Sequence, residues 1–272
     1  MHPVLTVIEW GGRQRPLGSY GALLALALVL GSALCVRAAA RAGLDVGATI
    51  ATLAISVGCA FLGADLVFVV VSWLHGARLE DALWHPGLVF YGGAVAGWLG
   101  GLVAGRALGL PVARLLDSIV PALPVGQAIG RVGCLLGGCC FGAPYAGPFA
   151  VSYTHPLAPA AHWPGPRHPW PLYEAGLLLL LALFFALWPV QRARDGERFA
   201  LYVVAYACVR AGLEPLRGDV VRGLYLGGVV STSQLLALAS GLLAVAVVLV
   251  RRRVGSKRAA ASRVAHLASR CT

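Results

Sequence analysis

The sequence predicts an all-α polytopic membrane protein with about seven transmembrane helices. Its mean hydropathy is +0.78, and 58% of its 272 residues are hydrophobic whereas 12% are charged, which places it outside the soluble globular class. A helix needs about 20 mostly apolar residues to cross a bilayer. The apolar runs of sufficient length cover residues 18–36, 48–74, 88–108, 115–137, 170–189, 198–216 and 230–250.

Basic residues gather at the ends of these runs and alternate between the two sides of the predicted membrane. Fourteen fall on one side: Arg37, Arg41, Arg106, Arg114, Arg192, Arg194, Arg198, Arg251, Arg252, Arg253, Lys257, Arg258, Arg263 and Arg270. Six fall on the other side: Arg13, Arg15, Arg78, Arg167, Arg217 and Arg222. Because cytoplasmic ends carry the excess of lysine and arginine, we expect the N-terminus outside and the C-terminus in the cytoplasm.

We expect one transmembrane domain over residues 1–250, followed by a basic cytoplasmic tail over residues 251–272 that faces anionic lipids. An external loop is expected at residues 143–169, and loops of this length are usually lids or disordered connectors. The net charge of +11 arises from residues that flank the spans, so no nucleic-acid partner is expected.

Two of the apolar runs carry unusual backbone signals. In the run 88–108, glycine recurs at positions 93, 97, 101 and 105, which favours close packing against another helix. The run 115–137 contains Pro121 and Pro124 and is expected to be broken. Since irregular backbone at membrane depth is tolerated only where it lines a cavity or is buried in protein, we expect one of these two settings here.

Charged side chains inside the apolar runs indicate where function lies. Arg131, Glu174, Arg210 and Glu214 each lie within such a run or at its edge. One ionised group at mid-membrane costs about 2.5–3.5 kcal/mol on insertion scales. Several groups of both signs therefore predict a polar chamber inside the membrane.

The run 198–216 places Tyr206, Arg210 and Glu214 at i, i+4 and i+8, on one face of a helix. Two interpretations remain open at this point. The Arg–Glu pair could fix one helix against its neighbour, or Arg210 could present its guanidinium to a phosphate while Glu214 orients it. Arginine suits the second task because its fork of donors grips phosphate oxygens and stays charged when buried.

The surroundings of Arg131 and Glu174 also favour a ligand site. Gly130 and Gly133 flank Arg131 and leave space around it, although a snorkelling arginine is the simpler alternative. Glu174 lies about one turn inside its run, which begins shortly after Arg167 and His168. The neighbouring Trp170 is interpreted as an anchor at the membrane interface.

Seven cysteines are present, and three of them cluster as Cys134, Cys139 and Cys140. This spacing matches no common zinc motif. Packing is the favoured interpretation, with a disulfide or redox-sensitive pair and a metal site as alternatives; we expect no metal and no cofactor.

Six blocks of the chain, in order, resemble the prolipoprotein diacylglyceryl transferase family, bacterial enzymes that attach diacylglycerol to lipoprotein precursors. The blocks are Ser19-Tyr20-Gly21, Tyr91-Gly92-Gly93, Gly126 to Gly133, Arg167-His168-Pro169 with Leu172-Tyr173-Glu174, Tyr206 with Arg210, Glu214 and Arg217, and Gln234-Leu235-Leu236. They extend over nearly the whole chain. Seven spans with an external N-terminus is also the topology that the resemblance implies.

The chain departs from the family pattern in three places. After Arg-x-Gly the family signature continues with two asparagines and Gly-Glu, where this chain has Cys134, Gly137, Gly138 and Cys139. Tyr91 stands where a histidine is usual, and Asp65 where an arginine is usual. The arginines that would grip phosphate are kept, whereas the groups that could move a proton are not.

The resemblance implies transfer of the diacylglyceryl group from phosphatidylglycerol to the lipobox cysteine of a prolipoprotein, in the bacterial plasma (inner) membrane. Arg131 and Arg210 would stabilise the leaving phosphate, with Glu214 holding Arg210. The base would be Tyr91, His168 or Glu174. The expected substrate-binding residues are Tyr20, Gln127, Gly130, Gly133, Arg167, Tyr206 and Arg217.

The expected partners are phosphatidylglycerol, prolipoprotein signal peptides and membrane lipids. Two alternatives stay open from the sequence. The protein could be a related membrane transferase with another acceptor, or a lipid-binding membrane protein that kept the fold and lost the reaction.

Overall fold

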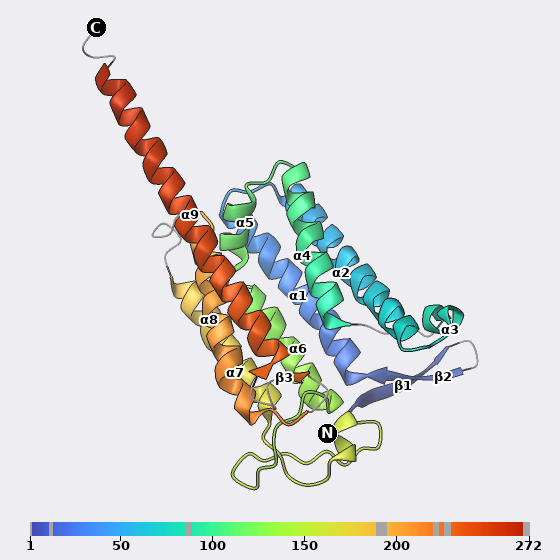
Figure 1. Cartoon of the computed structure of the whole chain (residues 1–272). Coiled ribbons are helices and arrows are strands. Elements are labelled where there is room, and N and C mark those ends of the chain that lie inside the picture. The colour runs from blue at the N-terminus through green and yellow to red at the C-terminus, as the bar shows by residue number, and fades with distance from the viewer. Residues whose placement is uncertain are drawn as a thin grey trace. The chain divides into compact units, whose positions relative to one another are not determined.

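The computed structural model describes residues 2–10, 13–84, 89–188, 195–219, 223–225 and 230–268 (Figure 1). Within these ranges the chain is mostly helical. In order, its elements are β1 (Val4–Trp10), β2 (Arg13–Gly18), α1 (Ser19–Arg41), α2 (Val46–Leu74), α3 (Leu79–Trp84), α4 (Phe90–Ala107), α5 (Val112–Ile119), α6 (Leu123–Gly137), η1 (Pro159–His162), α7 (Trp170–Leu187), α8 (Glu197–Leu213), η3 (Glu214–Leu216), β3 (Leu224–Tyr225), β4 (Val230–Ser231) and α9 (Thr232–Ala268). They form two compact units, the first from residues 1–31 and 120–272, the second from residues 32–119.

Helices long and apolar enough to cross a bilayer confirm the predicted class of membrane protein. Within the described residues there are five, α1, α2, α7, α8 and α9, and α5 with α6 adds a sixth if the two form one broken span. The expected run 88–108 is α4, which falls outside this set because glycines and Arg106 dilute its apolar character. The count of seven and the orientation stay predictions.

The N-terminal segment departs from the all-α expectation. β1 and β2 pair antiparallel, and the backbone N–H of Ser19 at the start of α1 donates to the Pro3 carbonyl at 2.9 Å. β1 is rich in β-branched and aromatic residues, which favour strands over helices. The strands lie before the first apolar run, where hydropathy alone gives no signal of them.

In the second unit, α2 and α4 pack closely along the predicted glycine stripe. A Cβ atom added to Gly97 would lie 2.8 Å from the Ala60 Cβ, and one added to Gly93 would lie 2.9 Å from the Ala60 carbonyl oxygen. The Ser56 hydroxyl donates to the Gly97 carbonyl at 2.8 Å. The predicted close helix packing is therefore confirmed.

In the first unit, α6 packs against α7, α7 against α8, and α8 against α9. The predicted break in the run 115–137 is confirmed, because α5 ends at Ile119 and α6 begins at Leu123, with Pro124 in its first turn. Proline is tolerated there because the first turn has no intrahelical partner for an N–H. Gly138 then ends α6 in the left-handed conformation, with φ of 73°.

The loop 143–169 and the C-terminal segment are more ordered than their composition suggests. Phe141, Tyr153, Ala158 and Ala160 form a small buried cluster at the loop. β-Bridges pair Arg167 with Pro144 and Val151. α9 continues through the predicted tail as far as Ala268.

Candidate functional site

The site in the first unit is built around Trp170, the first residue of α7. Its side chain is fully buried, and its indole Nε1–H donates to the Leu213 carbonyl at 2.8 Å. The guanidinium groups of Arg131, Arg210 and Arg217 lie over this ring, 5.6, 4.9 and 5.0 Å from its centroid. We call these three residues the arginine cluster. The interpretation of Trp170 as an interface anchor was wrong, since the ring is buried in protein and contacts three cations.

Arg131, from α6, pairs with the buried Glu174 of α7. Arg131 Nε lies 2.9 Å from Glu174 Oε2, although the N–H does not point at that oxygen well enough for a hydrogen bond. The Tyr206 hydroxyl donates to the other carboxylate oxygen, Oε1, at 2.9 Å. A buried carboxylate is stable only when it is paired in this way, so Glu174 and Arg131 hold each other in place.

Arg210, from α8, contacts Glu214 through Nη2 at 3.2 Å. The predicted i, i+4 pair is therefore present. The other terminal nitrogen, Arg210 Nη1, is buried and has no hydrogen-bond partner within the described part of the chain. A buried charged donor left unsatisfied costs more than the ~1–3 kcal/mol of a neutral one, and an anionic oxygen is the group that would satisfy it.

Arg217 follows η3 and is held by Asp219, which accepts from Nε and from Nη2, the latter at 2.8 Å. The next residue, Gly218, donates its backbone N–H to the Phe141 carbonyl at 3.0 Å. This contact brings Cys140 to the arginine cluster. Its sulfur lies 3.9 Å from Arg217 Nη2 and 4.0 Å from Arg131 Nη1.

The cluster is formally neutral, because its three guanidinium groups face three carboxylates, Glu174, Glu214 and Asp219. Such balance lowers the electrostatic cost of burying so many charges together. It also means that no carboxylate of the cluster stands apart from an arginine.

Two tyrosines of α8 extend the network. The Tyr202 hydroxyl donates to Gln127 Oε1 at 2.5 Å, and the rings of Tyr202 and Tyr206 lie parallel with centroids 6.3 Å apart. Sequence reasoning missed Tyr202. The signal was available, because Tyr202 precedes Tyr206 by four residues and so shares its helix face.

The predicted residues at the start of α1 and along α6 meet in part. A Cβ atom added to Gly133 would lie 3.4 Å from the Tyr20 Cδ2, so this glycine gives Tyr20 its room. A Cβ atom added to Gly130 would meet nothing within 4 Å in the described part of the chain. Gly130 therefore faces open space beside Arg131, as the sequence suggested.

Arg167 and His168 lie on the loop. Arg167 donates to the carbonyls of Trp163 at 3.1 Å and Gly142 at 3.3 Å, contacts that hold the loop together. The His168 ring stacks on Tyr145 with centroids 3.9 Å apart, and its Nδ1 lies 3.3 Å from the Tyr173 hydroxyl. Tyr91, the other base candidate, lies on α4 in the second unit.

Comparison with known proteins agrees with these observations. Residues 12–250 match the family model for prolipoprotein diacylglyceryl transferase. The phosphatidylglycerol–prolipoprotein diacylglyceryl transferase of Clostridium tetani is 30% identical over 230 residues, 80% of this chain and 87% of the relative. The enzyme of the same name from Dehalococcoides mccartyi is 33% identical over 222 residues, 80% of this chain and 82% of the relative. That from Geobacillus kaustophilus is 29% identical over 252 residues, 88% of this chain and 90% of the relative. The chain therefore belongs to the prolipoprotein diacylglyceryl transferase family.

Proposed function

We propose that this protein transfers the diacylglyceryl group of phosphatidylglycerol to the lipobox cysteine of prolipoproteins. The observation that carries the proposal is the arginine cluster, in which the buried Arg210 Nη1 has no hydrogen-bond partner among the described residues. Relatives named for this reaction match most of the chain.

In this reaction the acceptor sulfur, as thiolate, attacks the glycerol carbon that carries the phosphate ester. A carbon–sulfur bond forms, the carbon–oxygen bond breaks, and its electron pair leaves with glycerol phosphate. Arg131, Arg210 and Arg217 would stabilise the charge that develops on the leaving phosphate. Preorganised cations in a site shielded from water are effective in this task.

The neighbours of the arginines act as positioning residues in this proposal. Glu174, held by Tyr206, fixes Arg131, and Glu214 fixes Arg210. Gln127 would offer its amide N–H groups to donor oxygens, since its Oε1 already accepts from Tyr202. Tyr20 would contact the donor from the start of α1.

The same proposal places the protein in the bacterial plasma membrane, with seven spans, an external N-terminus and a cytoplasmic C-terminus. Phosphatidylglycerol and prolipoprotein signal peptides would reach the site from the membrane. Of the predicted bases, Glu174 is engaged by Arg131 and Tyr206, which favours a positioning role.

Complementation tests the proposal. In bacterial cells depleted of their own transferase, the wild-type chain should restore lipoprotein maturation, and Arg131→Ala and Arg210→Ala should fail. Removing a guanidinium that stabilises the leaving phosphate should lower the rate at least 100-fold, about 2.7 kcal/mol. The matched control is Arg106→Ala on α4, whose side chain is exposed and should be dispensable.

Two results would count against the proposal. Rescue by both cluster variants would remove the arginine cluster from the reaction. Failure of well-expressed wild type, together with no glycerol phosphate released from phosphatidylglycerol and a lipobox peptide, would favour another acceptor or a non-catalytic lipid-binding role.

A further inference from the structure

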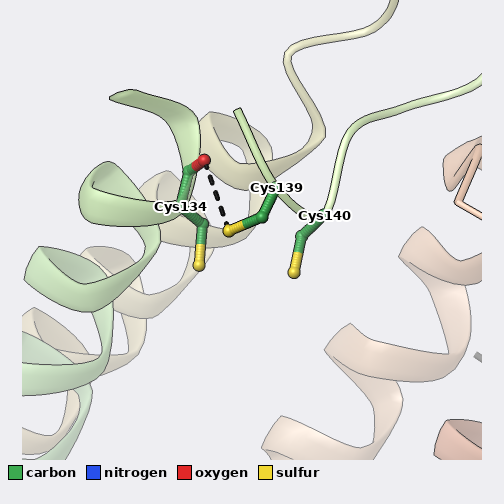
Figure 2. A group of neighbouring side chains, drawn as sticks. All are labelled: Cys134, Cys139 and Cys140. Carbon is green, nitrogen blue, oxygen red and sulfur yellow. Dashed lines mark hydrogen bonds between the residues drawn. The ribbon is translucent and has the colours of Figure 1, made fainter. Parts of the chain in front are cut away.

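Three thiols converge where α6 ends and the loop begins. Cys134 lies in the last turn of α6, and Cys139 and Cys140 follow Gly138 directly. Their sulfur atoms all lie within 4.8 Å of one another. Figure 2 shows the three side chains side by side, with Cys139 reaching toward Cys134.

The backbone is bent so as to bring these thiols together. Gly138 and Cys140 both have positive φ, 73° and 52°, and for a non-glycine residue this conformation costs about 1–2 kcal/mol. Two hydrogen bonds hold the bend: the Cys139 N–H donates to the Cys134 carbonyl at 3.1 Å, and the Ala160 N–H donates to the Gly138 carbonyl at 3.0 Å.

We propose that Cys134, Cys139 and Cys140 bind a zinc ion as thiolates and leave its fourth position open to the acceptor thiol. Tetrahedral zinc with bonds of about 2.3 Å places its sulfur ligands about 3.8 Å apart, so the cluster needs to contract by at most about 1 Å. Three protein ligands with one open position is the arrangement of catalytic zinc sites, whereas structural sites have four. Cys139 and Cys140 are only partly buried, which leaves an approach to the ion.

The surroundings suit an anionic metal centre. Zinc with three thiolates carries a net charge of −1, and the guanidinium groups of Arg131 and Arg217 lie within 4.0 Å of the Cys140 sulfur. A disulfide would use two of the sulfur atoms and leave the convergence of the third without a purpose.

The site would supply what the arginine cluster lacks, and this part of the inference rests on the proposed function. Each carboxylate of the cluster is already paired with an arginine, so activation of the acceptor thiol must come from elsewhere. A thiol that coordinates zinc is deprotonated outright, and its proton passes to water. The bound sulfur would then attack the glycerol carbon while the phosphate leaves toward the arginines.

Metal analysis of the full chain tests the site without any assay of transfer. The protein is purified in detergent with a disulfide reductant that carries no thiol, then supplied with zinc and dialysed. It should retain one zinc ion per chain. Cys134→Ser, Cys139→Ser and Cys140→Ser should each lose most of it. Cys208→Ser, which alters an exposed thiol on α8, is the matched control and should retain it.

Wild-type protein with reduced thiols and no retained zinc would overturn the proposal. Retention of zinc by all three cysteine variants would also overturn it. The same holds if protein extracted with its free thiols blocked contains a disulfide within the cluster.

Cobalt(II) in place of zinc tests the open position. This experiment uses the wild-type protein, so it does not depend on whether a variant folds. The d–d absorption of the cobalt protein should change on addition of a lipobox peptide with cysteine and not with the same peptide carrying serine. An identical response to both peptides would remove the acceptor from the metal. Zinc retention and the cobalt response without any transfer would leave the metal site standing and refute the proposed function instead.

Discussion

Trp170 joins three cations that come from distant parts of the sequence. Arg131 belongs to α6, Arg210 to α8, and Arg217 to the segment after η3, yet all three rest on one buried indole ring. Three guanidinium groups this close to one another repel. The π electrons of the ring and the paired carboxylates offset this repulsion.

Replacement of Trp170 should therefore disturb all three arginines at once. Each cation–π contact contributes about 0.5–2 kcal/mol, so Trp170→Leu should lower the transfer rate by at least about tenfold, or ~1.4 kcal/mol. Trp170→Phe keeps an aromatic face and loses only the hydrogen bond to Leu213, so its loss should be smaller. The rate of glycerol phosphate release measures both.

The control for this series is Trp73→Leu on α2, where 59% of the tryptophan surface is exposed. It should leave the rate unchanged. A Trp170→Leu variant that folds and transfers at the wild-type rate would show that the ring does not organise the arginines.

At the scale of elements, close approach of helices depends on missing side chains. α2 and α4 come together along Gly93 and Gly97, where any Cβ atom would meet Ala60. In a bilayer there is no hydrophobic drive to join two apolar helices, so their contact rests on such close packing.

Gly97→Ala should consequently destabilise the second unit. Overpacking of this kind costs about 1–3 kcal/mol, which corresponds to a fall in Tm of roughly 2–12 °C for a chain of this size. Thermal unfolding in detergent, followed by circular dichroism, measures the change. Gly58→Ala on α2 is the matched control, because a Cβ atom added there meets no other described residue within 4 Å, and it should leave the Tm unchanged or slightly raised.

For the whole molecule, the number of spans decides on which side each terminus lies. Among the residues that the structure describes, five single helices and one broken span make six, and an even number returns both termini to the same side. If α4 also crosses, the described helices reach the seven spans that we predict. At 18 residues and 1.5 Å per residue, α4 is about 27 Å long, close to the ~30 Å of a hydrocarbon core.

Terminal fusions distinguish the two counts. With seven spans and the proposed external N-terminus, green fluorescent protein at the C-terminus should fluoresce, and alkaline phosphatase at the N-terminus should be active. Each reporter exchanged to the other end should be silent. Reporters that behave alike at both ends would mean an even number of spans and would exclude the proposed orientation.

The sequence alone predicted a membrane protein built from helices and the pairing of Arg210 with Glu214. Apolar runs of bilayer length predict membrane helices, and the i, i+4 spacing of Arg210 and Glu214 fixed their pairing, because both are properties of one continuous helix. Close packing along the glycine stripe of α4 could be predicted for the same reason, because the stripe is also a property of one continuous helix.

Tertiary structure decided which distant residues meet. The burial of Trp170 beneath three arginines depends on how α6, α7 and α8 pack, and no local pattern contains that information. The convergence of Cys134, Cys139 and Cys140 depends on two positive φ angles and on hydrogen bonds to the folded loop. The spacing of the three cysteines in the sequence matches no common zinc motif, whereas the distances between their sulfur atoms favour a metal site. The two differ because a chain that reverses direction brings together ligands that linear spacing separates.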